Sequence, residues 1–479
     1  MIIGREKEKT ILENVYKSKK AELVAVFGRR RVGKTFLVRE FFSSKKCVFL
    51  QATGVQGDSM KKQLKKFVES VSEAFFDSVP IESPDSWGDT FNLLQTQIQK
   101  IKTKKKVVIF LDELPWMATR KSGLLQEIDY FWNHHWSKSG NVTLVVCGSS
   151  ASWLMKNIIY NRGGLHNRVT CQIRLLPFTL SETKDYFKSQ HIRLNSKHIL
   201  SLYMTFGGVP YYLNYIERGL TAEENIQKIV FDGNAPLMGE FDRLFYSLFE
   251  NADAYIELIK IVAKKKEGVI RSEIDSVAKL STGGGTLSKR LKDLCVAGFL
   301  EEYIPWGRSK GEYYKVIDEF CLFYLTWIYS QRNKKFTKNY WINQSQKPAY
   351  HAWSGYAFES VCMKHIDNII SALGIKAAAS TVSSWRYIPR KHLETGAQID
   401  LVIERTDNAI TLGEIKHTER VFVIDKRYAD IIKRKTEIFK SVTKTTKQIF
   451  VVMICSSGLK KNVHAEELIS GCVTLDDLF

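Results

Sequence analysis

The sequence lacks any apolar run long enough to span a lipid bilayer, and nothing in it resembles a secretory signal peptide. It also lacks paired cysteines, because its 8 cysteines are scattered along the chain and none stands in a C-x-x-C motif. This spacing favours reduced, buried thiols over a disulfide framework or a zinc site. We therefore expect a cytoplasmic protein with no membrane partner.

Acidic residues are in short supply. The chain has 51 Asp and Glu residues against 71 Lys and Arg residues, so its formal net charge is +20. A surplus of this size favours a polyanionic partner such as DNA, although a generally basic proteome would produce the same surplus. A length of 479 residues predicts roughly two to four domains, because one hydrophobic core rarely serves so long a chain.

The most informative motif runs from Gly28 to Thr35 and reads GRRRVGKT, which fits the pattern G-x-x-x-x-G-K-[ST] of phosphate-binding loops. A buried strand is predicted directly before it and a helix directly after it. The backbone around Gly28 and Gly33 would surround the phosphates of ATP. Lys34 would reach the β- and γ-phosphates, and the hydroxyl of Thr35 would bind Mg²⁺.

Alternating strand and helix patterns at 23–174 predict a parallel α/β sheet. The expected strands are 23–27, 47–51, 107–111, 143–147 and 169–174. The third ends in Asp112 and Glu113, the pattern of a Walker B element. Asp112 would hold Mg²⁺ and Glu113 would polarise the attacking water. The alternative is an acid pair at a helix N-terminus before Pro115.

A polar residue at the end of the fourth predicted strand would lie between the two Walker elements. Ser149 is our choice to contact the γ-phosphate or the attacking water, with Ser150 next to it. Because Gly-Ser-Ser is also common in loops, the motif alone is a weak signal.

Several of these elements together resemble a known family, the AAA-like archaeal ATPases related to STAND ATPases. The resemblance is carried by Ile3-Gly4-Arg5-Glu6, the arginine-rich loop, Arg168 ahead of a Leu-Leu-Pro-Phe stretch, and GGVPYYL at 207–213. It implies that residues 2–5, among them Ile3 and Arg5, and Pro210 line the adenine pocket. It also implies that Arg168 faces a γ-phosphate, in cis or, within a homo-oligomer, in trans. The alternatives are a structural Arg168 and a plain turn at 207–210.

The remaining chain divides, by pattern, into further units. We expect a P-loop ATPase core at 1–174, a helical lid at 175–250, a winged helix with a linker at 251–335, and a nuclease-like domain at 340–479. In the winged helix, basic residues of the helix at 287–297 and of the loop near Arg308 and Lys310 would contact DNA. A protein contact or a spacer is the alternative for this module.

A hairpin near the C-terminus carries a second candidate site. Strands at 397–403 and 410–416, joined by a turn at 406–409, would bring Asp400 level with Glu414. Residues two apart share a strand face, so Lys416 would lie beside Glu414. Two carboxylates and an ammonium would then meet at one point. The alternative is a surface hairpin with a cross-strand ion pair.

This arrangement resembles the D…E-x-K motif of PD-(D/E)XK nucleases, in the DUF234 domain that follows the winged helix in many such ATPases. The resemblance implies that Asp400 and Glu414 bind Mg²⁺, that Lys416 orients or deprotonates water, and that Glu359, on a helix opening at Gly355, completes the site. The chain departs from the motif by having Ile399 in place of its proline.

Taken together, the sequence predicts an α/β, AAA-like ATPase that binds ATP and Mg²⁺ and is coupled to a Mg²⁺-dependent DNA nuclease. The alternative is a STAND-type, nucleotide-switched signalling protein or DNA-binding regulator whose C-terminal domain binds without cleaving.

Overall fold

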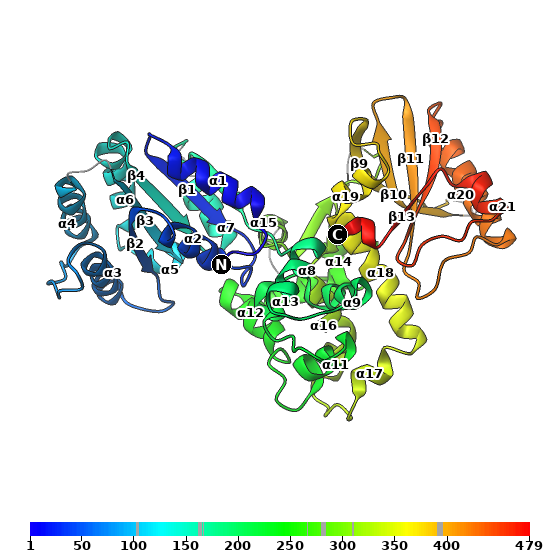
Figure 1. Ribbon diagram of the computed structural model, residues 1–479, viewed down its shortest axis with the longest axis horizontal. Helices are drawn as coiled ribbons and strands as arrows, with labels where there is room; N and C mark the ends of the chain where they lie inside the picture. Colours follow the sequence, from blue (N-terminus) through cyan, green and yellow to red (C-terminus); the bar gives the residue numbers. More distant parts are fainter. Residues whose placement is uncertain are drawn as a thin grey trace.

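The computed structural model describes residues 1–101, 105–160, 165, 167–265, 267–278, 284–308, 311–389 and 396–479. The chain forms three lobes along its long axis, an N-terminal α/β lobe, a helical centre and a C-terminal lobe built on a second sheet (Figure 1). None of the described helices is both long and apolar enough to cross a membrane.

The N-terminal lobe contains a parallel five-stranded sheet in the order β2-β3-β4-β1-β5. Its strands are β1 (Glu22–Phe27), β2 (Cys47–Thr53), β3 (Lys106–Asp112), β4 (Val142–Cys147) and β5 (Cys171–Arg174). β3 and β4 are buried along their whole length, which explains their unbroken apolar sequences. The predicted parallel α/β sheet is therefore confirmed, with strand ends that shift by one or two residues.

Helices cover both faces of this sheet. One face packs against α1 (Glu6–Lys17) and α2 (Lys34–Ser43). The other packs against α3 (Met60–Phe75), α4 (Trp87–Lys100) and α6 (Leu124–His134). The short helices α5 (Leu114–Met117) and α7 (Ala151–Leu154) follow β3 and β4. The carboxyl ends of the strands are thus left for the loops that carry the predicted Walker elements.

The centre begins with helices α8 (Leu180–Ser189), α9 (Ser196–Phe206), α10 (Pro210–Leu213), α11 (Ala222–Ile226) and α12 (Glu240–Leu248). We call this region the lid. α8 opens with a complete capping box, in which the Thr179 hydroxyl accepts from the Glu182 N–H and the Glu182 carboxylate accepts from the Thr179 N–H. A threonine followed three residues later by a glutamate is the sequence pattern of such a cap.

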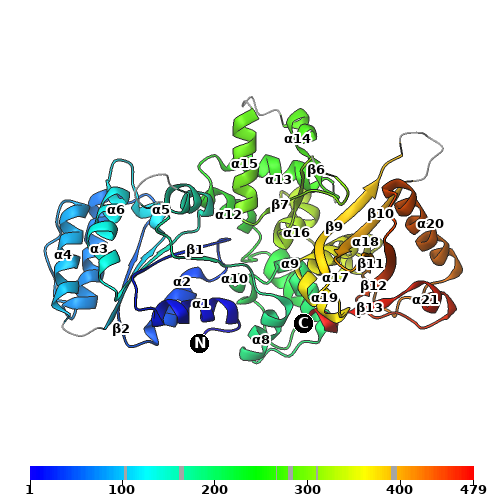
Figure 2. The same cartoon turned by 90° about the horizontal axis from the view of Figure 1, so that it is seen from above.

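Three helices and a small antiparallel sheet follow the lid. They are α13 (Ala252–Ala263), β6 (Val269–Ile270), α14 (Arg271–Val277), α15 (Gly284–Val296), β7 (Leu300–Tyr303) and β8 (Tyr313–Val316), with sheet order β6-β8-β7. α15 projects from the centre of the molecule (Figure 2). The sequence also predicts a turn at 281–286, of which 281–283 lie outside the described residues, as does Lys310, while 284–286 belong to α15.

The basic face expected on α15 is smaller than the sequence suggests. Lys289 and Lys292 are exposed, but Arg290 is buried, with its guanidinium 6.0 Å from the centroid of the Tyr255 ring. The heptad-like leucines of this helix leave Arg290 on the side that packs against α13. Arg290 is therefore packed inside this unit, which leaves Lys289 and Lys292 as the exposed basic residues of this part of the helix.

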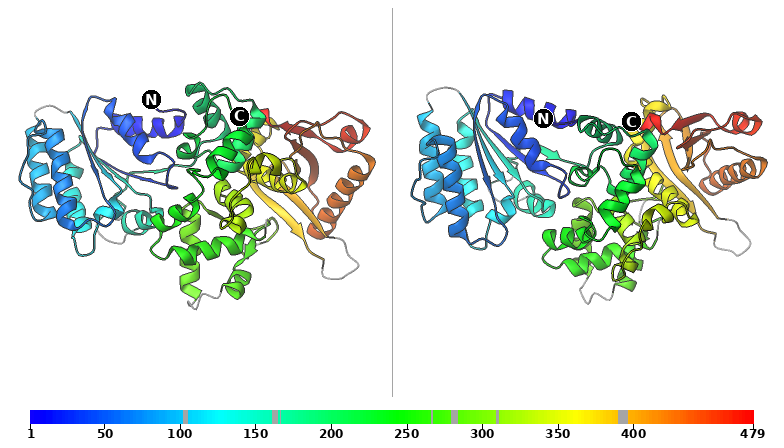
Figure 3. Two further views of the ribbon diagram at one scale, coloured as in Figure 1. Left: turned by 90° about the horizontal axis from the view of Figure 1, so that it is seen from below. Right: turned by 60° about the horizontal axis from the view of Figure 1, so that its bottom comes forward.

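The C-terminal lobe has a mixed five-stranded sheet in the order β13-β12-β11-β10-β9. Its strands are β9 (Ala379–Tyr387), β10 (Ala397–Arg405), β11 (Ala409–Lys416), β12 (Gln448–Cys455) and β13 (Gly471–Thr474). Four helices precede its first strand, namely α16 (Glu319–Trp327), α17 (Tyr340–Gln344), α18 (Pro348–Lys364) and α19 (Ile366–Ala372). Two more, α20 (Lys426–Thr443) and α21 (Val463–Leu468), lie between its later strands. α18 and α20 lie on opposite faces of the sheet (Figure 3).

The helix that carries Glu359 begins earlier than predicted. We expected it to open at Gly355, but α18 starts at Pro348, and Gly355 lies inside it. Proline is favoured at the first helical position, because its fixed φ suits the helix and its missing N–H needs no partner there. The glycine was mistaken for a helix boundary, although a glycine inside a helix is tolerated at a modest cost.

The apolar core is continuous across the last three of the four predicted domains, whose boundaries stay a prediction. One continuous cluster of buried side chains runs from Phe178 to Leu478 and joins the lid, the three-helix unit and one face of the C-terminal sheet. The N-terminal sheet has separate clusters on its two faces. At the junction, the Leu180 N–H donates to His365 Nε2 at 2.9 Å, which ties α8 to the end of α18.

Candidate functional site

A cavity of about 760 Å³ opens where the N-terminal sheet meets the lid. One end is polar and is formed by the loop before α2 together with Glu113 and Ser149, at the ends of β3 and β4. The other end is largely apolar and includes Ile3, Phe178 and Pro210. A volume of this size lies in the range of small-ligand sites, which commonly fall between roughly 300 and 1,000 Å³.

The loop between β1 and α2 requires glycine at its start. Gly28 has φ 141°, and a Cβ atom there would lie 2.2 Å from the Leu175 carbonyl oxygen. Gly33, with φ 91°, ends the loop at the N-cap of α2. The two glycines therefore let the backbone turn closely over β5 and aim the first turn of α2 at the cavity.

Lys34 lies folded across this loop. Its ammonium donates to the carbonyl oxygens of Gly28 at 3.2 Å and Arg29 at 3.0 Å. The side chain is buried, and burial lowers the pKa of its ammonium. A cation held this way inside a glycine-bounded loop is suited to binding an anion that enters the cavity.

Thr35 and Asp112 meet at the polar end of the cavity. The Thr35 hydroxyl lies 2.9 and 3.1 Å from the two carboxylate oxygens of Asp112, which is buried at the end of β3. Burial raises the pKa of Asp112. A hydroxyl and a carboxylate are hard oxygen donors of the kind that Mg²⁺ prefers, so the residues present fit a magnesium ion.

Glu113 and Ser149 are bonded to each other. The Glu113 carboxylate accepts from the Ser149 N–H at 2.9 Å and also from the Ser149 hydroxyl. Glu113 has φ 49°, a left-handed conformation that is uncommon outside glycine. The end of β3 and this turn place the carboxylate beside the end of β4, where Ser149 follows the strand. The role of Ser149 toward phosphate or water stays a prediction.

Two of the three arginines in the loop bind acids from outside the N-terminal lobe. Arg29 is buried and donates through Nε and Nη2 to the two carboxylate oxygens of Asp318, which caps α16. Arg31 forms an ion pair of 2.8 Å with the buried Glu240 of α12 and lies 3.9 Å from the centroid of the Tyr211 ring. Sequence reasoning missed both partners, and the run of three arginines was the only signal.

Burial alone would raise the pKa of Asp318, but the charge of Arg29 outweighs it and holds that pKa below its usual value. The hydroxyl of Tyr212 joins the group, because it accepts from Arg29 at 3.3 Å and donates to Glu240 at 3.1 Å. The loop, the lid and α16 therefore share one buried polar network.

Residues near the N-terminus form the wall of the cavity's apolar end. The Arg5 N–H donates to Glu182 at 2.7 Å, and the Arg5 guanidinium lies 4.5 Å from the centroid of the Phe178 ring. Ile3 and Pro210 face the same end, and Pro210 opens α10. These positions agree with an adenine pocket, whose residue roles remain predictions.

Arg168 lies apart from this site. Its side chain is exposed, and it is not among the described residues that line the cavity. The proposed contact of Arg168 with a γ-phosphate, in cis or in trans, stays a prediction.

The second candidate site shows the predicted register. Leu401 pairs with Gly413 and Val402 with Leu412, so Asp400 stands level with Glu414. However, the pairing of β10 with β9 shifts between Ile399 and Val402, which marks a β-bulge. Its effect appears in the core, where Ile399 and Val402 face α20 and Leu401 faces α18.

The two carboxylates consequently turn to different sides. The Asp400 carboxylate accepts from the Ile415 N–H at 3.1 Å and lines a cavity on the α18 side. Glu414 is bound on the α20 side, at 2.6 Å from the Lys435 ammonium and 3.2 Å from the Tyr428 hydroxyl. The charges of Glu414 and Lys416 nevertheless act on Asp400, so the predicted convergence of the three groups stays a prediction, and the bulge that changes the direction of Asp400 could not be foreseen from strand alternation.

Lys416 does lie beside Glu414, as the two-residue spacing predicts, with 3.6 Å between ammonium and carboxylate. Burial would lower the pKa of Lys416, but Tyr428, Glu414 and Asp400 outweigh it and raise that pKa. Burial and the charge of Glu414 raise the pKa of Asp400. Within the described part of the chain, no group of three or more His, Cys, Asp and Glu side chains is placed to hold a metal ion.

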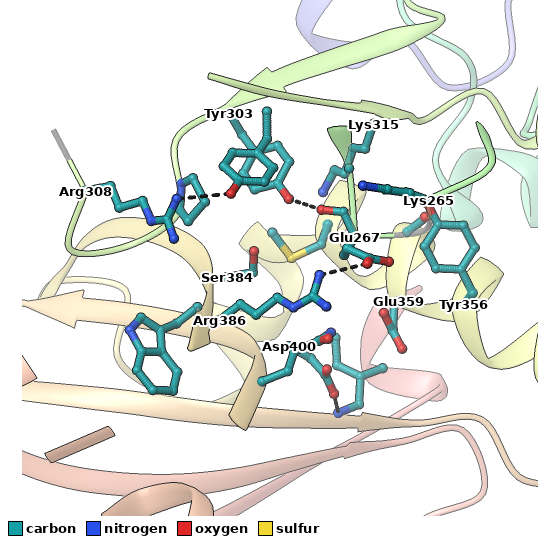
Figure 4. Close-up of a pocket in the computed structure, with 18 of the residues that line it drawn as sticks. Lys265, Glu267, Tyr303, Arg308, Lys315, Tyr356, Glu359, Ser384, Arg386 and Asp400 are labelled. Carbon is teal, nitrogen blue, oxygen red and sulfur yellow. Dashed lines mark hydrogen bonds and ion pairs between the residues drawn. The ribbon is translucent and has the colours of Figure 1, made fainter. Parts of the chain in front are cut away.

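A second cavity, of about 210 Å³, separates the three-helix unit from the C-terminal sheet. Asp400 and Glu359 face it from below, and Lys265, Arg308 and Lys315 line it from above (Figure 4). An ion pair of 2.7 Å between Arg386 of β9 and Glu267 crosses the opening. Glu359 and Asp400 thus share a cavity, as predicted for neighbours in one site, but Glu414 is not among its lining residues.

The β7–β8 loop is docked on the C-terminal lobe. The Trp306 N–H donates to the Ser384 carbonyl at 3.0 Å, and its indole N–H donates to Glu404 at 3.2 Å. The indole also lies 5.1 Å from the ring of Phe439 on α20. Arg308 donates to the Tyr313 hydroxyl at 3.0 Å beside the cavity. Arg308 itself is exposed, so the expected contact of this loop with DNA stays a prediction.

Comparisons of the sequence with known proteins give two archaeal relatives and one matching family model. The chain is 23% identical over 422 residues to an uncharacterized protein of Methanocaldococcus jannaschii, covering 87% of each chain. It is 44% identical over 46 residues to an uncharacterized ATP-binding protein of the same organism, covering 10% of this chain and 78% of the relative. Residues 2–216 match the model of a family described as an ATPase domain predominantly from Archaea.

Among solved structures, the chain is similar to a Walker-type ATPase of Pyrococcus abyssi, with 17% identity, a TM-score of 0.49, and coverage of 68% of this chain and 96% of that one. It is also similar to the ORC2 protein of Aeropyrum pernix in ADPNP–ADP complexes, with 12% identity, a TM-score of 0.45, and coverage of 67% and 92%.

Proposed function

We propose that the chain binds and hydrolyses ATP in the cavity between the glycine-bounded loop and the lid, a proposal supported by the match of residues 2–216 to the model of an ATPase domain predominantly from Archaea. The observation that carries the proposal is the gathering of Lys34, the Thr35–Asp112 pair and the Glu113–Ser149 pair at one end of that cavity. These are an anion-binding cation, a set of hard oxygen donors and a carboxylate suited to orient water.

The roles of the residues follow from their chemistry. The loop N–H groups and Lys34 hold the β- and γ-phosphates, and Thr35 and Asp112 would hold Mg²⁺, which when bound offsets phosphate charge. Glu113 orients the attacking water once its carboxylate leaves Ser149. The water oxygen bonds to the γ-phosphorus, the bond to ADP breaks, and ADP retains the electron pair.

Loss of the loop lysine tests this function. Purified protein should release phosphate from ATP, whereas Lys34→Ala should lose nucleotide binding and with it phosphate release. Isothermal titration with a non-hydrolysable ATP analogue measures the binding directly. An ATP affinity in Lys34→Ala equal to that of the wild type would remove the loop from its assigned role.

We further propose that the three-helix unit with β6, β7 and β8 is a winged helix, and that the molecule acts on DNA. The order of helices and strands supports the first point, and the net charge of +20 supports the second. Exposed Lys289 and Lys292 on α15 are the basic residues best placed to meet phosphates.

For the C-terminal domain, the geometry favours binding over cleavage. Asp400 and Glu414 face different sides of the sheet, and Glu414 is already paired with Lys435 and Lys416. This pairing supports a binding role, because Glu414 would have to leave both lysines to share a Mg²⁺ with Asp400. We therefore propose a nucleotide-switched DNA-binding protein, and nuclease action by Asp400, Glu414, Lys416 and Glu359 is the competing hypothesis. Incubation of plasmid DNA with Mg²⁺, with and without ATP, distinguishes the two.

A further inference from the structure

Arg30 differs from both of its neighbours in the loop. Arg29 is bound to Asp318 and Arg31 to Glu240, so both serve contacts with the centre of the molecule. Arg30 lines the nucleotide cavity together with Lys34, Glu113 and Ser149. Arg31 also lines the cavity, but its charge is paired with Glu240, whereas Arg30 has no ion pair among the described residues.

The guanidinium of Arg30 has a cation–π contact but lacks a hydrogen-bonding partner at one nitrogen. It lies 5.7 Å from the centroid of the Trp116 ring, which limits its freedom of movement. Its Nη1 atom is buried and has no hydrogen-bond acceptor among the residues that the structure describes. A buried N–H donor of a cation without an acceptor is unfavourable, so an anion that enters the cavity here would supply a favourable partner.

No nearby acid supplies that acceptor. Glu113 is the acid whose charge acts most on Arg30, opposing the lowering of the Arg30 pKa by burial. However, the Glu113 carboxylate is already bonded to the N–H and hydroxyl of Ser149. Arg30 therefore faces the polar end of the cavity as a cation whose natural partner is a phosphate.

We propose that Arg30 is a catalytic residue that contacts the terminal phosphate of ATP and stabilises the charge that develops during hydrolysis. This inference rests on the proposed ATPase function. As water adds to the γ-phosphorus and the bond to ADP breaks, negative charge grows on the bridging oxygen that leaves with ADP. The proton of the water passes to Glu113 or to the departing phosphate. Arg30 supplies its charge from the same chain, as a finger arginine in cis.

The test separates binding from turnover. Arg30→Ala should lower kcat for ATP hydrolysis by at least about 100-fold, because a finger arginine acts on the transition state, while the Kd for ATP changes by no more than about threefold. Arg30→Lys should recover little of the loss, because an ammonium lacks the planar fork of donors. Arg39→Ala is the matched control, since Arg39 is an exposed arginine on α2 and does not line the cavity.

Two further readouts are specific to this assignment. Wild-type protein with ADP and aluminium fluoride should form a long-lived complex that mimics the transition state, and Arg30→Ala should fail to form it while still binding ADP. Turnover per chain should also stay constant on dilution, because the arginine comes from the same chain. Turnover that falls on dilution and is lost in Arg168→Ala would overturn the assignment in favour of an arginine supplied in trans.

The possible results distinguish failure of the role proposed for Arg30 from failure of the proposed ATPase function. If the wild type hydrolyses ATP and Lys34→Ala does not, but Arg30→Ala keeps kcat within threefold, the role of Arg30 is overturned and the ATPase function stands. Loss of ATP and ADP binding in Arg30→Ala, with unchanged thermal unfolding, would also overturn it, because Arg30 would then be a ground-state ligand. Absence of hydrolysis by the wild type would instead overturn the proposed function.

Discussion

Arg29 of the phosphate-binding loop is bound through two nitrogens to Asp318, a residue 289 positions later in the chain. Both side chains are buried. Asp318 caps α16, and the next residue, Glu319, pairs at 2.6 Å with Lys364 at the end of α18. The nucleotide site is thus joined by two consecutive ion pairs to the helix that carries Glu359.

Asp318→Asn should destabilise the protein strongly. Removing one partner of a buried ion pair leaves the other charge without compensation, which costs about 3–5 kcal/mol in the free energy of unfolding. Urea unfolding followed by circular dichroism measures this. Glu217→Gln is the control, because the Glu217–Lys228 pair is about half exposed and should contribute less than about 1 kcal/mol. Equal effects in both variants would contradict the importance of the buried pair.

The contribution of Asp318 should depend on pH. The folded-state pKa of Asp318 is lowered from its ordinary value of 3.8. The pair therefore stabilises the protein fully above about pH 4, and this stabilisation is lost as the pH falls through the lower folded-state pKa. The difference in unfolding free energy between wild type and Asp318→Asn should shrink as the pH is lowered from 7 to 3. A difference that grows instead would mean the opposite shift.

Glu113→Gln should separate ATP binding from hydrolysis. The amide keeps the size of the side chain but cannot take a proton from water, so turnover should fall by about 100-fold or more while ATP binding persists. Phosphate release and titration calorimetry measure the two properties. Glu69→Gln, at an exposed position of α3, should behave like the wild type. Unchanged turnover in Glu113→Gln would remove this residue from the mechanism.

DNA should be bound but left intact. A mobility-shift assay should show an affinity that falls steeply with salt, because Lys and Arg contacts to phosphate release counterions. Lys289→Ala combined with Lys292→Ala should weaken binding and reduce that salt dependence. Supercoiled plasmid should remain uncut with Mg²⁺. Nicking that disappears in Asp400→Ala and in Lys416→Ala would establish the nuclease instead.

Trp306→Ala should release the β7–β8 loop from the C-terminal lobe. The substitution removes the hydrogen bond to Glu404 and the contact with Phe439, so the edge strand β9 loses part of its cover. Hydrogen exchange of amides in β9 should become faster by about tenfold, which corresponds to about 1.4 kcal/mol in local opening. Exchange in β2, in the other lobe, should be unchanged. Unaltered exchange in β9 would show that the docking is unimportant.

The N-terminal sheet could be predicted because its evidence is local. Buried strands read as unbroken apolar runs, and the loop from Gly28 to Thr35 has a fixed pattern of residue types. The turn and the register of the β10–β11 hairpin were equally local. The capping box at Thr179 and Glu182 was also visible, because both members lie within one turn of the same helix.

What could not be predicted depends on contacts distant in sequence or on backbone irregularity. The partners of Arg29 and Arg31 come from α16 and α12, and no spacing rule links them. The bulge at Asp400 breaks the alternation that was used to place its side chain on one face with Glu414. The burial of Arg290 likewise depends on how α15 packs against α13.

The continuous core from Phe178 to Leu478 also bears on how such a chain can evolve. A module with its own core can be exchanged by recombination, because its removal exposes little apolar surface elsewhere. Here the lid, the three-helix unit and the C-terminal sheet share their apolar interior, so removal of any one of them would expose apolar surface on the others. The N-terminal lobe has its own clusters on both faces of its sheet, so a different partner block could replace the rest only if that block supplied acids for Arg29 and Arg31.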